Sequence, residues 1–151
     1  MRSLTLVAFG CFILLGSLSW AGNLKKTQKI AADSLRANEV LKRVATENMA
    51  NAESAGYAPK SVFITPSKNR QTNVSSVRVK KIRQNNRKTI QKYDPNHPKA
   101  DENGYVTMPD VNPLTELMNI QETKHRSERA LRVYEVATEL RHKTIGLISG
   151  R

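Results

Sequence analysis

The chain has 151 residues, of which 38% are hydrophobic and 5% aromatic, so it has the length of one domain but little apolar material for a core. Its 25 basic and 13 acidic side chains give a formal net charge of +12, a balance that favours a protein that completes its fold on a partner over a solitary globular enzyme. The single cysteine, Cys11, excludes a disulfide framework and a thiolate metal cluster within this sequence.

The first 21 residues follow the order of a secretory signal. One positive charge at Arg2 precedes a twelve-residue apolar run, and the small residues Ser19 and Ala21 occupy the −3 and −1 positions of a cleavage site. We expect cleavage after Ala21, which makes residues 1–21 a signal peptide. The alternative is an uncleaved membrane anchor, because residues 3–24 carry no charge and about 20 apolar residues can span a bilayer.

Residues 22–56 are predicted to form an N-terminal helix and its cap. The stretch 23–53 has no proline or glycine, and small or amide residues recur seven apart along it, which indicates a helix-packing seam. Gly56 fits a left-handed cap, and Pro59 prevents the helix from resuming.

This helix would be roughly 45 Å long at about 1.5 Å per residue, too long for so thin a core to cover. We therefore expect it to pack on neighbouring subunits; an amphipathic helix that packs on its own domain is the alternative. The residues expected at the subunit contact are Asn38, Leu41, Ala45, Asn48, Asn51 and Ala52.

Residues 57–112 are predicted to form a basic, β-rich insert and an extended connector. The β-prone runs 61–65 and 73–79 predict two or three irregular strands, the first bounded by Pro66. The insert holds six basic side chains within thirteen residues, Lys80, Lys81, Arg83, Arg87, Lys88 and Lys92. They fit a solvated strand face or a surface for anionic lipid or polymer. Nucleic acid is not expected as a partner, because no aromatic residue is interleaved with them.

The connector, residues 93–112, is predicted to be neither helix interior nor regular sheet. Its three prolines fix φ and remove hydrogen-bond donors, and its one glycine permits positive φ. The distinctive residues of the connector are Tyr93, Pro95, His97, Pro98, Asp101, Gly104, Tyr105, Pro109 and Asn112.

Residues 113–151 are predicted to form a C-terminal helix, with Pro113 in its first turn and the helical pattern running to residue 148. Alternating spacings of three and four predict a second seam, made of Ala130, Val133, Ala137, Leu140, Thr144 and Leu147. The predicted fold is α+β: two long terminal helices in a coiled-coil-like hairpin, with a small irregular β-rich insert and an extended connector.

No group of residues has the parts of a reaction or cofactor site. The histidines His97, His125 and His142 lack the spacing of a zinc helix, and Pro98 occupies a ligand position of the one stretch that resembles a calcium loop. Phosphate-binding and nucleophile motifs do not occur either. We therefore expect no enzyme, no catalytic residue, no metal and no cofactor.

Three segments resemble bacterial flagellar basal-body rod proteins of the FlgC type. Residues 44–57 are similar to the N-terminal signature of flagellar axial proteins, an amide-rich run that ends in Gly-Tyr, here Gly56 and Tyr57. The connector, YDPNHPKADENGYVTMPDVN, is similar to the FlgC type in particular, and residues 112–119 resemble the start of its last helix.

The resemblance implies a structural subunit of the flagellar basal-body rod in the periplasm. Such a subunit transmits torque through helix packing with copies of itself and with other rod subunits, without catalysis or cofactor. The sequence departs from the family pattern at Thr46, Glu47, Glu128 and Arg129.

The leader is a further departure, because rod proteins of this family pass through the flagellum's own export channel. Either general secretion delivers the subunit to the periplasm, or the protein serves another periplasmic assembly. Membrane contact is expected only through an uncleaved N-terminal segment. The alternative function is a basic periplasmic peripheral binding protein attached to anionic lipid or polymer.

Overall fold

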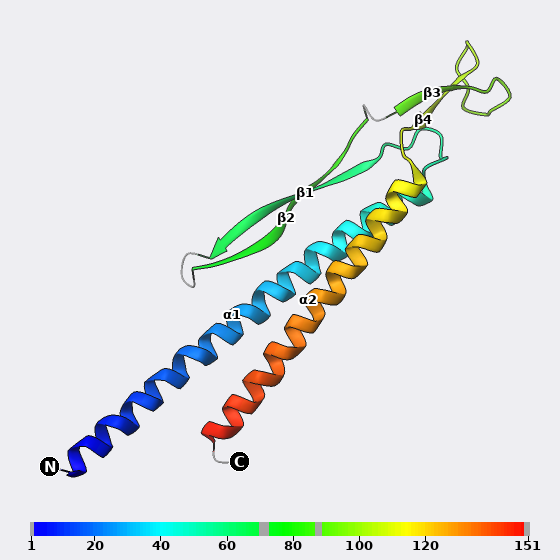
Figure 1. Ribbon diagram of the computed structural model, residues 1–151. Helices are drawn as coiled ribbons and strands as arrows, with labels where there is room; N and C mark the ends of the chain where they lie inside the picture. Colours follow the sequence, from blue (N-terminus) through cyan, green and yellow to red (C-terminus); the bar gives the residue numbers. More distant parts are fainter. Residues whose placement is uncertain (1, 70–72, 87–88, 150–151) are drawn as a thin grey trace.

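The computed structural model describes the backbone of residues 2–69, 73–86 and 89–149, and the side chains of these residues except 2–22 and 148. In sequence, four strands lie between two long helices. The order is α1 (Arg2–Ala50), β1 (Lys60–Asn69), β2 (Val74–Gln84), β3 (Thr89–Tyr93), β4 (Tyr105–Pro109) and α2 (Pro113–Ile148). The helices lie side by side, and the start of α1 and the end of α2 lie at the same end of an elongated molecule (Figure 1). The fold is therefore mixed α and β, as predicted, while supercoiling of the helix pair stays a prediction.

The predicted signal peptide, residues 1–21, lies outside the residues whose side chains are described. Among the residues that are described in full, neither helix contains a stretch long and apolar enough to cross a membrane.

One face of α2 packs toward α1 and carries a row of partly or fully buried residues. The row follows heptad spacing and consists of Glu116, Ile120, Thr123, Ser127, Ala130, Ala137, Arg141 and Thr144. Polar contacts join the helices far from their connection: Gln28 of α1 donates to Thr138 Oγ1 (2.6 Å) and accepts from Arg141 (3.2 Å). Small and polar residues in this row allow the helices to approach closely but bury little apolar area.

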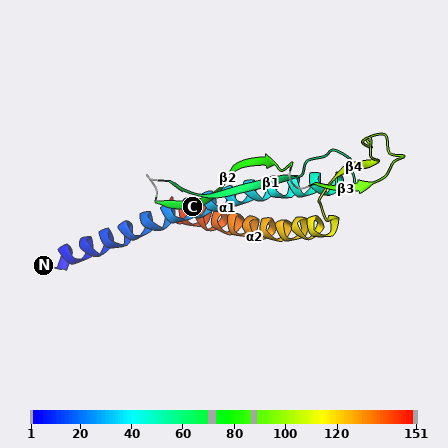
Figure 2. The same ribbon diagram turned by 90° about the horizontal axis from the view of Figure 1, so that it is seen from above.

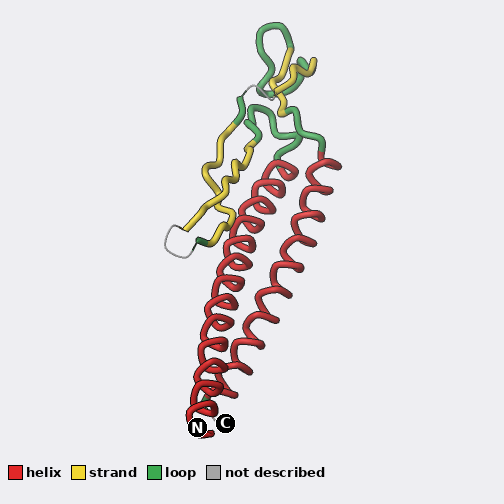
Figure 3. The backbone as a smooth tube through the Cα atoms, turned by 60° about the vertical axis from the view of Figure 1, so that its left-hand side comes forward, coloured by secondary structure: helices red, strands yellow, loops and turns green. Residues whose placement is uncertain are grey.

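The β1–β2 pair is an antiparallel hairpin that packs along α1 (Figure 3). Seen from above, the hairpin and α2 lie on different sides of α1, so α1 is the element that contacts both (Figure 2). The predicted boundary at Pro66 is wrong, because β1 continues through it to Asn69. A strand of a two-stranded sheet has a free edge, which tolerates the missing donor of a proline.

The β3–β4 pair projects beyond the ends of both helices (Figure 1). The prediction that the connector contains no regular sheet is therefore wrong for Tyr105–Pro109, which forms β4. Two prolines lie in the loop outside the paired residues, and Pro109 ends β4 opposite Thr89, so none interrupts the ladder.

The helix boundaries follow local chemistry. α1 ends at Ala50, a few residues before the predicted end at residue 53, and Gly56 has the expected positive φ of 81° in the turn that follows. α2 begins at Pro113 as predicted. Its N-cap is Asn112, whose side-chain oxygen accepts hydrogen bonds from the backbone of Leu114 (2.9 Å) and Thr115 (3.3 Å).

Candidate functional site

Asn48 joins four segments of the chain at the end of α1. Its side-chain nitrogen donates to the carbonyl of Lys60 (2.9 Å) and to Glu116 of α2 (3.3 Å). Its side-chain oxygen accepts from the backbone N–H of Lys60 (2.8 Å) and the hydroxyl of Tyr57 (3.0 Å). Because only 4% of Asn48 is exposed, these bonds form in a covered site, where leaving a polar group unpaired is costly. We call these four residues the Asn48 clamp.

Charged groups surround the clamp. The ammonium of Lys60 pairs with the carboxylate of Glu47, and Asn51 closes the end of α1 by donating to the carbonyl of Glu47 (2.8 Å). Burial raises the pKa of Tyr57 above its usual value, and the negative charges of Glu47 and Glu116 raise it further while Lys60 opposes them. The Tyr57 hydroxyl therefore stays protonated and donates to Asn48 at neutral pH.

The loop between β3 and β4 is closed by its own backbone and by Asp101. The carboxylate oxygen Oδ1 of Asp101 accepts from the backbone of Asn103 (2.9 Å) and Tyr105 (2.8 Å). The backbone N–H of Gly104 donates to the carbonyl of Asp101 (3.0 Å), and the carbonyl of Gly104 accepts from Asp94 (2.9 Å). These bonds give the loop a defined shape without help from the helices.

Gly104 has a φ of 80° and lies against two residues of the same loop. A Cβ at this position would lie 3.0 Å from the ring of Tyr93 and 3.1 Å from Pro95. The rings of Tyr93 and Tyr105 pack edge to face with centroids 5.3 Å apart. The connector residues that resemble the FlgC type thus include the ones that shape this loop.

The loop is tied to the turn after α1. The backbone N–H of Gly56 donates to the carbonyl of Thr107 (2.8 Å), and the ammonium of Lys99 donates to the carbonyl of Ala55 (2.8 Å). His97 lies in a turn, and its Nδ1 accepts from the backbone N–H of Lys99 (3.0 Å). Pro98 also lies in this turn.

The β1–β2 hairpin brings basic side chains around an aromatic ring. Phe63 lies opposite Lys81, and its ring centroid is 5.5 Å from the Lys81 ammonium and 5.8 Å from the guanidinium of Arg83. The register shifts between Phe63 and Ile64, which leaves Lys80 as the extra residue of a bulge. The prediction overlooked this aromatic residue because it comes from the partner strand. Two of the six basic residues, Arg87 and Lys88, lie outside the described residues.

Asp33 connects α1 to β2. It forms ion pairs with Lys29 (3.1 Å) and Arg36 (3.4 Å), both on α1. Burial opposes its ionisation, but hydrogen bonds from Lys29 and Ser76 together with the charges of Lys29 and Arg36 outweigh that effect and lower the pKa of Asp33. Ser76 lies on β2, so this carboxylate lies where the hairpin meets the helix.

The residues expected at subunit contacts fall into two groups. Asn38, Ala45, Asn48 and Ala137 are buried within the chain, and Leu41, Asn51 and Ala52 are half-buried. Val133, Leu140 and Leu147 are exposed, and Leu147 is 85% exposed. The α1 seam is thus largely covered by the chain itself, whereas part of the predicted α2 seam is uncovered.

Within the described residues, no three His, Cys, Asp or Glu side chains are grouped as metal ligands.

Comparison with known proteins identifies the family. No family model matches the chain. The flagellar basal-body rod protein FlgC of Agrobacterium fabrum is 33% identical over 132 residues, which cover 83% of this chain and 95% of that protein. The chain belongs to the FlgC family of flagellar basal-body rod proteins. The FlgC proteins of Salmonella typhimurium and Salmonella typhi are each 27% identical over 124 residues, 78% of this chain and 92% of their own length. The resemblance to the FlgC type in the sequence is thereby confirmed.

Proposed function

We propose that this chain is a structural subunit of the flagellar basal-body rod that transmits torque across the periplasm by packing helices against copies of itself and other rod subunits. The observation that carries the proposal is an uncovered apolar stripe along the C-terminal half of α2. It consists of Val133, Val136, Leu140 and Leu147, all exposed in the single chain. Apolar faces of this kind on an elongated helix mark a contact with another chain.

The two groups of seam residues have different roles in this proposal. The α2 stripe contacts neighbouring subunits, and two half-buried residues extend that contact, Leu41 on α1 and Ala52 in the turn after it. The buried Asn38, Ala45 and Asn48 hold α1 to the rest of the chain, so that a load applied to one helix is shared by the other. This role requires no catalysis and no cofactor.

The assembly test uses Leu140→Lys combined with Leu147→Lys. Burying each leucine contributes about 2 kcal/mol, and a lysine in an apolar contact adds a desolvation cost, so the variant should be missing from isolated basal bodies and the cells should lose motility. A chain with Glu128→Lys and Glu135→Lys carries two new lysines outside the stripe and should still assemble. Normal incorporation of the leucine variant would contradict the stripe as a contact.

We further propose that the leader, residues 1–21, delivers the chain to the periplasm by general secretion. Mass spectrometry of its N-terminus in basal bodies and in the soluble periplasmic fraction tests this. A chain that starts at Gly22 in basal bodies supports the route. A chain that starts at Gly22 only in soluble periplasm indicates another assembly, and a chain that retains Met1 in basal bodies contradicts cleavage.

The alternative, a basic protein bound to anionic lipid or polymer, is favoured by the cations around Phe63. Exposed charge contacts are screened by salt. Binding of the chain to vesicles that contain anionic lipid, lost at high salt, would support this alternative, whereas association with rod subunits that persists at high salt supports the rod function.

A further inference from the structure

The charges of the insert are segregated into two neighbouring segments. Residues 54–93 contain ten basic side chains and no acidic one, whereas residues 94–110 contain four acidic side chains and a single lysine. The first segment includes the β1–β2 pair, which we call the basic hairpin. The second comprises the β3–β4 loop, β4 and Asp110, which we call the acidic tip. Such opposite fields on two parts of one chain point to an electrostatic contact.

The described charges of these two segments do not neutralise each other within the chain. Among the described residues, no ion pair joins the basic hairpin to the acidic tip, and the ion pair of the hairpin is between Lys60 and Glu47 of α1. Glu102 and Asp110 are exposed and take part in no described ion pair. Both segments therefore present charge to a second molecule.

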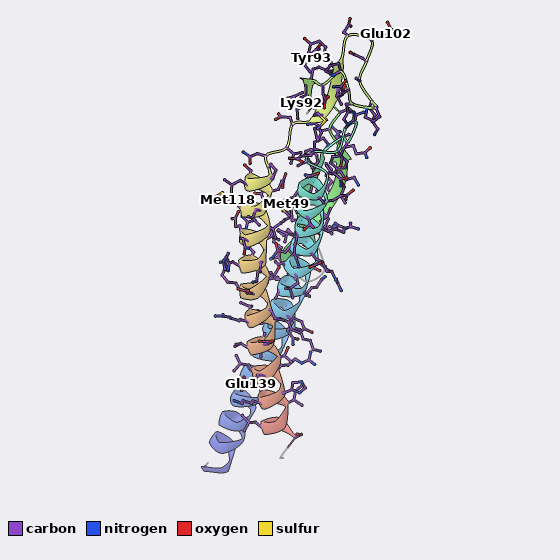
Figure 4. The ribbon with its side chains drawn as sticks, turned by 90° about the vertical axis from the view of Figure 1, so that its right-hand side faces the viewer. Met49, Lys92, Tyr93, Glu102, Met118 and Glu139 are labelled. Atoms are coloured by element: carbon purple, nitrogen blue, oxygen red, sulfur yellow. The ribbon has the colours of Figure 1, made fainter. Side chains whose placement is uncertain are left out.

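The positions of the basic hairpin and the acidic tip keep these two surfaces apart in one copy. The acidic tip projects beyond the ends of both helices, whereas the basic hairpin lies alongside α1, closer to the chain termini (Figure 1). Glu102 lies at the outer end of the tip, beyond Lys92 and Tyr93 (Figure 4). A second copy displaced along the long axis would bring its hairpin to the level of the first copy's tip.

The local chemistry of the two surfaces is also complementary. Lys81 and Arg83 are held near the ring of Phe63, and the bulge at Lys80 adds a third cation to this part of β2. On the tip, Glu102 follows Asp101 directly, and Asp101 uses its Oδ1 for the loop while Oδ2 makes no described bond. The cluster of cations on the strand is therefore complementary in charge to the pair of carboxylates on the closed loop.

We propose that the acidic tip of one copy binds the basic hairpin of a second copy of this chain. The proposal rests on the proposed rod function, because it describes one contact between neighbouring copies. The two surfaces differ, so the contact is head to tail and repeats from copy to copy along an open array or a ring. Each exposed ion pair is weak, so the contact contributes register and rate of association more than affinity.

The test uses basal bodies isolated from cells that are shifted from light to heavy nitrogen during rod assembly, so that light and heavy copies of the full chain enter the same rod. A zero-length carbodiimide joins a carboxylate to an ammonium that touches it, and mass spectrometry of mixed-isotope peptides reports links between copies. We expect links from Glu102 to Lys80 or Lys81. Reversal of the hairpin (Lys80→Glu with Lys81→Glu) or of the tip (Glu102→Lys with Asp110→Lys) removes one of the two reacting groups and should abolish these links.

The combined chain with all four reversals separates this proposal from binding to another polyanion. In this chain the two substituted positions of the tip are basic and the two substituted positions of the hairpin are acidic. Links between residue 102 of one copy and residues 80 or 81 of another should therefore return. A matched control, Lys42→Glu with Arg43→Glu, reverses two exposed charges of α1 outside both segments and should leave the links unchanged.

Three outcomes would overturn the proposal. If the chain is in basal bodies without these links, the head-to-tail contact is wrong while rod membership stands. If the four reversals fail to restore the links, the hairpin recognises another polyanion, such as anionic lipid. If the chain is missing from native basal bodies, the rod function and the contact fail together.

Discussion

Asn48 satisfies both ends of its amide with partners from three segments outside α1. The backbone N–H and C=O of Lys60, the first residue of β1, both bond to this one side chain, which fixes where the strand begins. An amide can do this because it offers donors and an acceptor in one plane, which neither a carboxylate nor an alkyl group provides. Asn48 therefore sets the geometry between α1, β1 and α2.

Replacing Asn48 by alanine should lower the free energy of unfolding by about 2–3 kcal/mol, because both backbone groups of Lys60 lose their partner in a covered site. Tyr57→Phe removes a single hydrogen bond of the same clamp and should cost about 1 kcal/mol. Urea unfolding of the purified chain, followed by circular dichroism, measures both. Equal effects of the two variants would show that the Lys60 bonds contribute little.

Gly104 combines backbone strain with crowding, and Gly56 provides the matched control. Both glycines have positive φ, but a Cβ on Gly56 would meet only the Lys99 ammonium at 4.0 Å. Alanine at either position should cost about 1–3 kcal/mol for strain, and Gly104→Ala should cost more because Tyr93 and Pro95 must move. Urea unfolding compares the two variants, and near-ultraviolet circular dichroism of the Tyr93–Tyr105 pair reports the movement. A smaller loss for Gly104→Ala than for Gly56→Ala would refute the crowding argument.

At the scale of elements, the hairpin and α1 pack against each other incompletely. A groove of about 430 Å³ lies between them, lined by Ala37, Val40 and Val77 among others, so the two surfaces do not fit tightly everywhere. Asp33 lies beside Ser76 at the edge of this groove. Polar contacts therefore supplement packing here, as the bonds of Lys60 to Asn48 and Glu47 do where β1 begins.

The attachment should weaken in acid. The folded-state pKa of Asp33 lies below its unfolded value, so its contribution is present above about pH 4 and is lost as the pH falls through the folded pKa. Asp33→Asn should lower stability at pH 7 and reduce its decline below pH 4. Thermal unfolding at pH 7 and through the acid range measures this, with Glu39→Gln, an exposed carboxylate of α1, as the control. An unchanged acid decline in the Asp33 variant would contradict the assignment.

The sequence predicts the helices better than the strands, because helical signals are local. Pro113 and the apolar periodicity place α2 correctly from 113 to 148, and Gly56 is recognised as a left-handed residue before any contact is known. The α2 seam that the sequence predicts for contact with other subunits shares Ala130, Ala137 and Thr144 with the row that packs toward α1. Hydrophobicity favours Leu140 for the seam, whereas the row toward α1 contains Arg141. The reason is the partner, since Gln28 on α1 offers Arg141 an acceptor.

Local sequence patterns do not predict how the strands pair. The contact of Phe63 with Lys81 and Arg83 depends on the register of β1 against β2 and on a one-residue bulge, neither of which is encoded in either strand alone. β4 was missed for a related reason, since Tyr105–Pro109 is short and ends in proline, and only pairing with β3 makes it a strand. The Asn48 clamp likewise joins residues far apart in sequence.

At the scale of the whole molecule, the buried apolar residues are few and small among those whose side chains the structure describes. They are Ala31, Ala37, Val44, Ala45, Val74, Val106 and Ala137, and Val106 is the largest that is fully buried. Larger apolar side chains, including Met118 on the outer side of α2, are exposed (Figure 4). Since apolar burial is the main favourable term in folding, much of what would stabilise the helices lies outside the single chain.

We therefore expect the helices to be held more firmly in the rod than in the free chain. Amide hydrogen exchange of the C-terminal half of α2 should be slowed at least roughly tenfold in isolated basal bodies relative to the free chain, because each 1.4 kcal/mol gained on assembly reduces local opening by that factor. The backbone around Asn48 serves as an internal control, since its bonds form within one copy and should protect it in both states. Equal protection of α2 in the free chain and in the rod would mean that the stripe from Val133 to Leu147 is not covered on assembly, and the helix-packing function would then have to be abandoned.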